Sequence, residues 1–114
     1  MKMKRILTAF AGAVVIFGGC EAFNNYPPPV TPNMARTGNR SGTTMEKLEH
    51  GRTLFAGRCI ECHVLPAIAH YPAEKWPRIV DWMGERAALK PAEREAVIAY
   101  VLAAHAENQP TSEK

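Results

Sequence analysis

The stretch Cys59-Ile60-Glu61-Cys62-His63 limits the folds open to this chain more than any other part of it. Its two thiols lie three positions apart, and an imidazole follows the second thiol directly. This spacing is typical of the covalent attachment of a c-type haem, in which the two sulfurs form thioethers with the two vinyl groups of the porphyrin. The motif therefore predicts one covalent haem held by Cys59 and Cys62, with His63 as the proximal iron ligand.

Two other chemistries use paired cysteines, and a chance match is a third alternative. A zinc site needs a second pair of Cys or His ligands, whereas the only further cysteine is the distant Cys20. A thioredoxin-like dithiol needs a strand before its first cysteine, whereas the residues before Cys59 have a helical pattern. Because an export signal and suitable helices accompany the motif, haem is favoured over all three.

The N-terminal residues have the layout of a secretory signal peptide. Residues 1–5 are cationic, and residues 6–19 are apolar or small, a run too short to cross a bilayer comfortably. Phe17-Gly18-Gly19-Cys20 resembles the lipobox of bacterial lipoproteins. This resemblance implies that residues 1–19 are removed and that a lipidated Cys20 holds the protein on the periplasmic face of a membrane. Ordinary cleavage with a free Cys20 thiol, or an uncleaved anchor, are the alternatives. Each of them exports the domain.

The charge of the mature chain argues against nucleic-acid binding. The 114 residues include 14 basic and 11 acidic side chains, a formal net charge of +3. Lys2, Lys4 and Arg5 leave with the signal peptide, so 11 basic residues remain against 11 acidic ones. The propionates of a haem would make the mature protein slightly acidic. No basic stripe is left to bind a phosphate backbone.

Beyond Cys20 the composition divides the chain into three parts. Residues 20–42 are rich in Pro and Asn, favour polyproline II and lack periodic apolar residues. They are expected to form an extended tether if Cys20 is lipidated, and otherwise a disordered leader. Residues 43–106 are expected to fold into a haem domain, and residues 107–114 to form a disordered tail.

The folded part shows the pattern of three helices and no useful strand pattern. The first is expected up to about Arg58, with Thr43 or Thr44 as its cap and an acidic first turn. A second covers residues 74–86 with Pro77 in its first turn, and a third runs from Pro91 to residue 104. Apolar residues recur at three- and four-residue spacing in each. The prediction is an all-α, compact three-helix domain around one haem.

With its helices placed, the domain resembles a small monohaem cytochrome c of the class I type. The resemblance spans about residues 43–106 and rests on Gly51-x-x-x-Phe55-x-x-x-Cys59-x-x-Cys62-His63. It implies that Gly51 allows an aromatic residue of the last helix, here Tyr100, to approach closely. It also implies that the carbonyl region at Pro66 accepts a hydrogen bond from the proximal imidazole.

The segment after the motif is shorter than in many class I cytochromes. Its Trp76-x-x-Ile79-Val80-x-x-Met83 pattern is similar to that of compact haem domains in which the methionine binds iron. The resemblance implies that Met83 is the distal ligand. Trp76 is expected to lie over the haem edge or to donate its indole hydrogen to a propionate, or else to be a core or rim aromatic.

Other side chains compete with Met83 for the sixth position on the iron. Met83 could instead fill the core, as most helical methionines do. His70, on the loop seven residues after His63, would give a bis-histidine site. His50 and His105 are expected to be solvated.

A His63–Fe–Met83 site would have no open coordination position. The prediction is therefore an electron carrier and not an enzyme, which exchanges electrons with redox proteins of the envelope through small, short-lived contacts. If Met83 does not bind iron, the alternative is a haem-based gas sensor. A haem subunit of a larger oxidoreductase is a further alternative.

Overall fold

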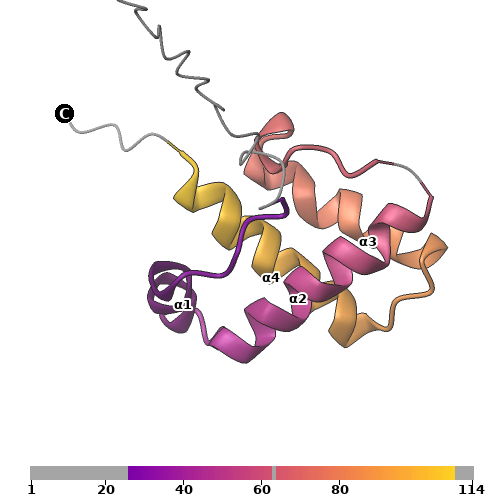
Figure 1. Ribbon diagram of the computed structural model, residues 1–114. Coiled ribbons are helices and arrows are strands. Elements are labelled where there is room, and N and C mark those ends of the chain that lie inside the picture. The colour runs from indigo at the N-terminus through magenta and orange to yellow at the C-terminus, as the bar shows by residue number, and fades with distance from the viewer. Residues whose placement is uncertain (1–25, 63, 110–114) are drawn as a thin grey trace, which may run out of the picture.

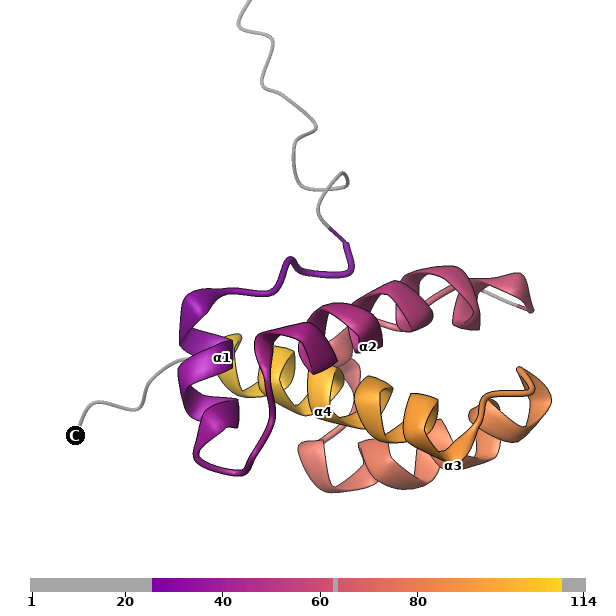
Figure 2. The ribbon, with the colours of Figure 1, turned by 90° about the horizontal axis from the view of Figure 1, so that it is seen from below.

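The computed structural model describes residues 26–62 and 64–109, and these residues form an all-α fold. The α-helices are α1 (Pro32–Asn39), α2 (Met45–Gly57), α3 (Trp76–Arg86) and α4 (Pro91–Glu107). Short 3₁₀ turns lie between α2 and α3: η2 (Cys59–Glu61), η3 (Ile68–His70) and η4 (Ala73–Lys75). Helix α4 lies between α2 and α3, and α1 crosses near the C-terminal end of α4 (Figure 1, Figure 2). The all-α prediction is confirmed.

Local sequence signals explain where the helices begin. The Thr44 side chain caps α2 by accepting a hydrogen bond from the Lys47 amide, and Glu46 occupies the first turn. Prolines lie in the first turns of α3 and α4, where a missing amide costs nothing. Helix α3 begins two residues later than predicted because η4 occupies the chain before it. Helix α4 continues to Glu107, three residues beyond the predicted end, so the expected tail begins later than residue 107.

The core centres on the crossing of α2 and α4. Leu48, Val97 and Tyr100 are completely buried there. A Cβ atom on Gly51 would lie 2.0 Å from the Ala96 carbonyl oxygen and 2.9 Å from the Tyr100 Cβ. Only a residue without a side chain permits this approach. The predicted contact between Gly51 and Tyr100 is therefore confirmed.

The prediction of an extended tether over residues 20–42 is wrong for the part that the structure describes. Thr31 caps α1 by accepting a hydrogen bond from the Met34 amide, and Pro32 fits the first helical turn. Met34 is 2% exposed and packs in the core. This one buried side chain supplies apolar contact that the composition of the segment did not indicate. The domain therefore has four α-helices in the described ranges, not three. Residues 1–25, with the predicted signal peptide and Cys20, lie outside them.

Residues 26–31, here called the N-terminal strap, run across α2 and α4 before α1 begins (Figure 2). The Arg52 guanidinium donates hydrogen bonds to the Pro27 and Pro28 carbonyls at 2.9–3.2 Å. The Tyr100 hydroxyl donates to the Pro28 carbonyl at 2.5 Å. Thr31 donates to the Glu107 carboxylate at 2.7 Å. The folded unit thus includes Tyr26, 17 residues before its predicted start. Across this described region no helix is long and apolar enough to span a membrane.

Candidate functional site

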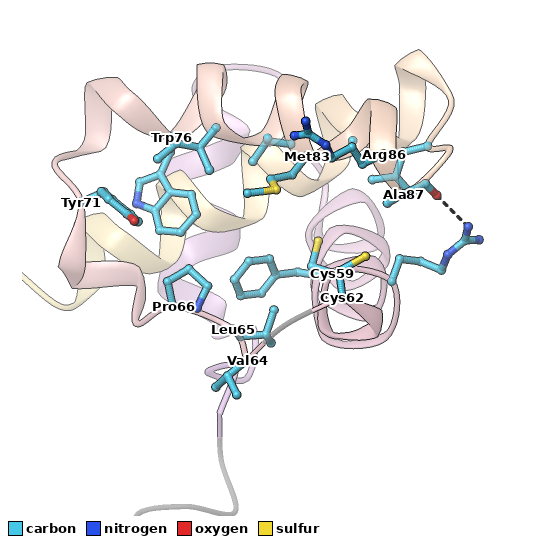
Figure 3. A pocket seen from close by; sticks show the side chains of 16 residues that line it. Cys59, Cys62, Val64, Leu65, Pro66, Tyr71, Trp76, Met83, Arg86 and Ala87 are labelled. Atoms are coloured by element: carbon cyan, nitrogen blue, oxygen red, sulfur yellow. Dashed lines mark hydrogen bonds between the residues drawn. The ribbon is translucent and has the colours of Figure 1, made fainter.

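A cavity of about 420 Å³ lies between the end of α2, helix α3 and the loop that follows the Cys59–Cys62 motif. Its volume falls in the range of roughly 300–1,000 Å³ that is usual for ligand pockets. Figure 3 shows the sixteen side chains that line it. Most of them are apolar, which favours a large apolar ligand over a small polar one. The apolar members are Phe55, Val64, Leu65, Pro66, Trp76, Ile79, Val80, Met83, Ala87 and Leu89.

Three sulfur-containing side chains meet in this cavity. Cys59 belongs to η2, Cys62 follows it directly, and Met83 comes from α3. In Figure 3 the Met83 sulfur enters from the α3 side, and the two cysteine sulfurs are directed toward the same space from the opposite side. The structure thus brings together three of the sequence-predicted ligands. The fourth, His63, lies outside the described residues.

The two thiols differ in their surroundings. Cys59 is half-buried and Cys62 is exposed. Burial raises the pKa of the Cys59 thiol, and the neighbouring Cys62 raises it further. Cys59 is therefore a protonated thiol at neutral pH, unlike the reactive cysteines whose pKa is lowered. Within residues 26–62 and 64–109, no three His, Cys, Asp or Glu side chains gather in a group that could hold a metal ion.

Trp76 forms part of the cavity wall, but its indole hydrogen is not available to a propionate. The side chain is 1% exposed, and its Nε1–H donates to the Ile68 carbonyl at 3.0 Å. An indole has a single donor, so the expectation that it binds a propionate is wrong. The ring packs edge-on against Phe55 and Tyr71, with centroid separations of 6.2 Å and 5.7 Å. Trp76 therefore links the core to the cavity.

Residues 64–71, here called the cavity loop, are held by side chains from distant parts of the chain. The Tyr26 hydroxyl of the N-terminal strap donates to the Pro66 carbonyl. Trp76 binds Ile68, as described above. The His105 Nε2 of α4 donates to the Tyr71 carbonyl at 3.1 Å.

The other histidines occupy positions that the sequence predicted only in part. His105 is 8% exposed, so the expectation that it is solvated is wrong, because α4 turns it toward the cavity loop. His50 is exposed, as expected. His70 is also exposed; its ring packs against Tyr71 at 4.7 Å, and it does not line the cavity. Its position favours Met83 over His70 as the side chain that faces a ligand.

Two arginines line the cavity, and the sequence had assigned no role there to Arg58. Arg58 donates to the Ala87 carbonyl at 2.7 Å and so connects the end of α2 to the end of α3 (Figure 3). Its guanidinium also lies 3.8 Å from the Glu61 carboxylate. Arg86, for which the sequence allowed either a propionate partner or an exposed helix charge, stacks on the Trp82 ring, 3.9 Å from its centroid. Arg58 directly precedes Cys59 in the sequence, and this was the signal that could have placed it at the cavity.

No protein-family model matches this chain, and neither the curated proteins nor the solved structures include a significant match. The site is therefore interpreted from its own residues. Its defining features are the gathered sulfurs, the apolar lining and a loop held by hydrogen bonds from three side chains.

Proposed function

We propose that this protein carries one covalently attached c-type haem and transfers electrons in the bacterial cell envelope. One observation carries the proposal: the sulfurs of Cys59, Cys62 and Met83 reach a single apolar cavity of about 420 Å³. The residues present fit the group, because the thiols have the attachment spacing and the thioether approaches from the facing helix. The resemblance to small monohaem class I cytochromes supports the same interpretation.

Each sulfur and the motif histidine would have a distinct role. Cys59 and Cys62 would each add across one vinyl group of the porphyrin. Each thiol would be converted to a thioether with its hydrogen passing to the other vinyl carbon, so the attachment would need no oxidant. His63 would bind the iron as the proximal ligand and Met83 as the distal ligand. When bound, the haem would supply reversible one-electron chemistry at its iron.

The cavity lining would set the behaviour of this site. The buried Phe55, Val80 and Leu89 side chains give the cavity an apolar wall. An apolar environment disfavours the extra positive charge of the oxidised iron centre, and a methionine ligand acts in the same direction, so the reduction potential would be raised. If His63 and Met83 both bind the iron, no position would be left for a substrate. This favours an electron carrier over an enzyme or a gas sensor.

The strap shortens the distance that we expect between the membrane and the folded domain. If Cys20 is lipidated, only six residue steps separate it from Tyr26, the first described residue. Six steps span at most about 20 Å. The domain would therefore stay close to the membrane surface rather than search from a long tether, and its redox partners would have to reach it there.

The test is to produce the full chain in cells that attach c-type haem and to examine the purified protein by voltammetry and ligand binding. We expect one reversible one-electron couple and slow binding of carbon monoxide by the reduced protein, because Met83 would occupy the iron. Rapid carbon monoxide binding would contradict the carrier and favour the gas sensor. A haem-free protein would contradict the proposal as a whole.

A further inference from the structure

The N-terminal strap reaches the candidate site at one residue, Tyr26. Its hydroxyl donates a hydrogen bond to the Pro66 carbonyl, 40 positions further along the chain. Pro66 lines the cavity and lies three residues after His63. The contact therefore joins the segment that leads from the N-terminus to the wall of the cavity.

Tyr26 holds a different part of the cavity loop from the other two side chains. Trp76 binds the loop at Ile68, and His105 binds it at Tyr71. Tyr26 binds it at Pro66, the contact nearest in sequence to His63. Movement of the loop at Pro66 would thus be transmitted to the motif histidine over the shortest stretch of chain.

The strap offers Tyr26 a firm base. Pro27 and Pro28, the next two residues, accept hydrogen bonds from Arg52 of α2, and Pro28 also accepts one from Tyr100 of α4. Both helices belong to the core crossing. Burial raises the pKa of Tyr26, an effect that the Ile68 backbone amide partly offsets. The hydroxyl thus stays protonated, and able to donate, throughout the neutral pH range.

We propose that Tyr26 is a positioning residue for the redox site: its hydroxyl, fixed through the strap to α2 and α4, holds Pro66 and thereby the part of the cavity wall that lies three residues after His63 in the sequence. This inference rests on the proposed function. Metal-bound histidines ordinarily donate their second ring N–H to a carbonyl, a carboxylate or water, and such partners fix the ring. If the loop moved at Pro66, His63 would be held less firmly. The proposed bond between the iron and Met83 would then open more readily.

The test compares Tyr26→Phe with Tyr100→Phe in the full-length, haem-loaded protein. Each variant loses one hydroxyl that binds at or through the strap, but only Tyr26 contacts the cavity loop. In Tyr26→Phe we expect severalfold faster carbon monoxide binding by the reduced protein. We also expect the red absorption band of methionine-ligated ferric haem to disappear at a lower pH than in the wild type. Tyr100→Phe should lower the unfolding temperature and change both properties less than Tyr26→Phe does, because Arg52 still holds the Pro27 and Pro28 carbonyls.

Two further measurements separate positioning from general stability. Hydrogen exchange of the peptide spanning residues 64–71 should be faster in Tyr26→Phe than in Tyr100→Phe, and this readout does not depend on the redox activity of the haem. Fluorotyrosine at position 26 keeps the ring and a strong donor, so it should restore the wild-type values.

Different results would overturn the role of Tyr26 and the proposed function. Equal carbon monoxide rates, band titrations and loop exchange in the two variants would overturn the role of Tyr26, even in a protein that carries haem. A wild-type protein without haem would instead overturn the proposed function, which is decided before any variant is compared.

Discussion

At the scale of single residues, Met83 decides what the site can do. It lines the cavity from α3, opposite the two cysteines of the motif. If its sulfur binds iron, the site has no open position and is suited to electron transfer. If Met83 only fills space, as many helical methionines do, the iron remains open to small ligands. The distinction between carrier and sensor therefore depends on one thioether.

We expect Met83→Ala to abolish the red absorption band of methionine-ligated ferric haem and to make the reduced protein bind carbon monoxide rapidly. Met45→Ala is the matched control, because Met45 is 42% exposed at the start of α2 and does not line the cavity. It should leave both properties unchanged. Survival of the band in Met83→Ala would show that another side chain is the distal ligand.

Some residues of the site could be predicted from the sequence, and others could not. Cys59 and Cys62 are fixed by a local motif, and Met83 lies at a helical spacing from Trp76 that places both on one face. Tyr26 and His105 contact the cavity loop across sequence separations of 40 and 34 residues. No periodic pattern encodes such contacts, because they arise only when the helices have packed.

At the scale of elements, the crossing of α2 and α4 holds the domain together. Gly51 lets the two backbones approach, and Tyr100 is buried beside it. This crossing fixes the end of α2, from which the chain enters η2 and the cysteine motif. A disturbance at the crossing would therefore reach both the core and the cavity.

Gly51→Ala should lower the free energy of unfolding by at least about 2 kcal/mol, since the added Cβ overlaps backbone atoms of α4 that cannot move independently. Gly57→Ala, in the same helix, is the control: nothing lies within 4 Å of a Cβ there. Alanine also has a better helix propensity than glycine by about 0.5–1 kcal/mol. Urea denaturation should find the control as stable as the wild type or more so. Equal stability of the two variants would contradict the close crossing.

Helix α1 shows where sequence interpretation was incomplete. The starts of α2, α3 and α4 carry strong caps or prolines and long apolar patterns, and these were predicted well. Helix α1 has only eight residues in a Pro- and Asn-rich stretch, and one of them is buried. The pair Thr31–Pro32, a cap followed by a first-turn proline, was the usable signal. The Pro- and Asn-rich composition of residues 20–42 led instead to the prediction of an extended tether.

We expect Met34→Ala to cost about 2–4 kcal/mol of stability, as large-to-small substitutions in a core do, because Met34 is 2% exposed. Met45→Ala removes the same atoms from an exposed site and should change stability by no more than about 0.5 kcal/mol. Thermal unfolding of the two variants makes the comparison. If Met34→Ala behaves like Met45→Ala, the segment is a tether after all.

At the scale of the whole molecule, the strap, α1 and the helical core form one unit whose N-terminal end is tied to the cavity loop. In Figure 2 the strap lies on the α2 side of α4, whereas α3 lies on the other side. A lipid on Cys20 would lie within about 20 Å of Tyr26, at the N-terminal end of the strap. Helix α3, with the exposed Trp82 beside Arg86, would face away from the strap.

If Cys20 is the lipidated residue, the wild-type protein should sediment with membranes and its N-terminal peptide should begin at Cys20 and carry the mass of the acyl chains, whereas Cys20→Ser should lack that added mass. Haem content should be the same in both, because Cys20 is not part of the attachment motif. A wild-type protein that is itself soluble would remove the anchor and leave the haem proposal intact.

The most direct test of the central claim is the mass of the denatured, protease-digested protein after expression with a haem-attachment system. We predict that the peptide containing Cys59, Cys62 and His63 carries the added mass of exactly one haem, and that Cys59→Ala with Cys62→Ala abolishes this addition. Recovery of the unmodified peptide with two free thiols from the wild-type protein would contradict the account.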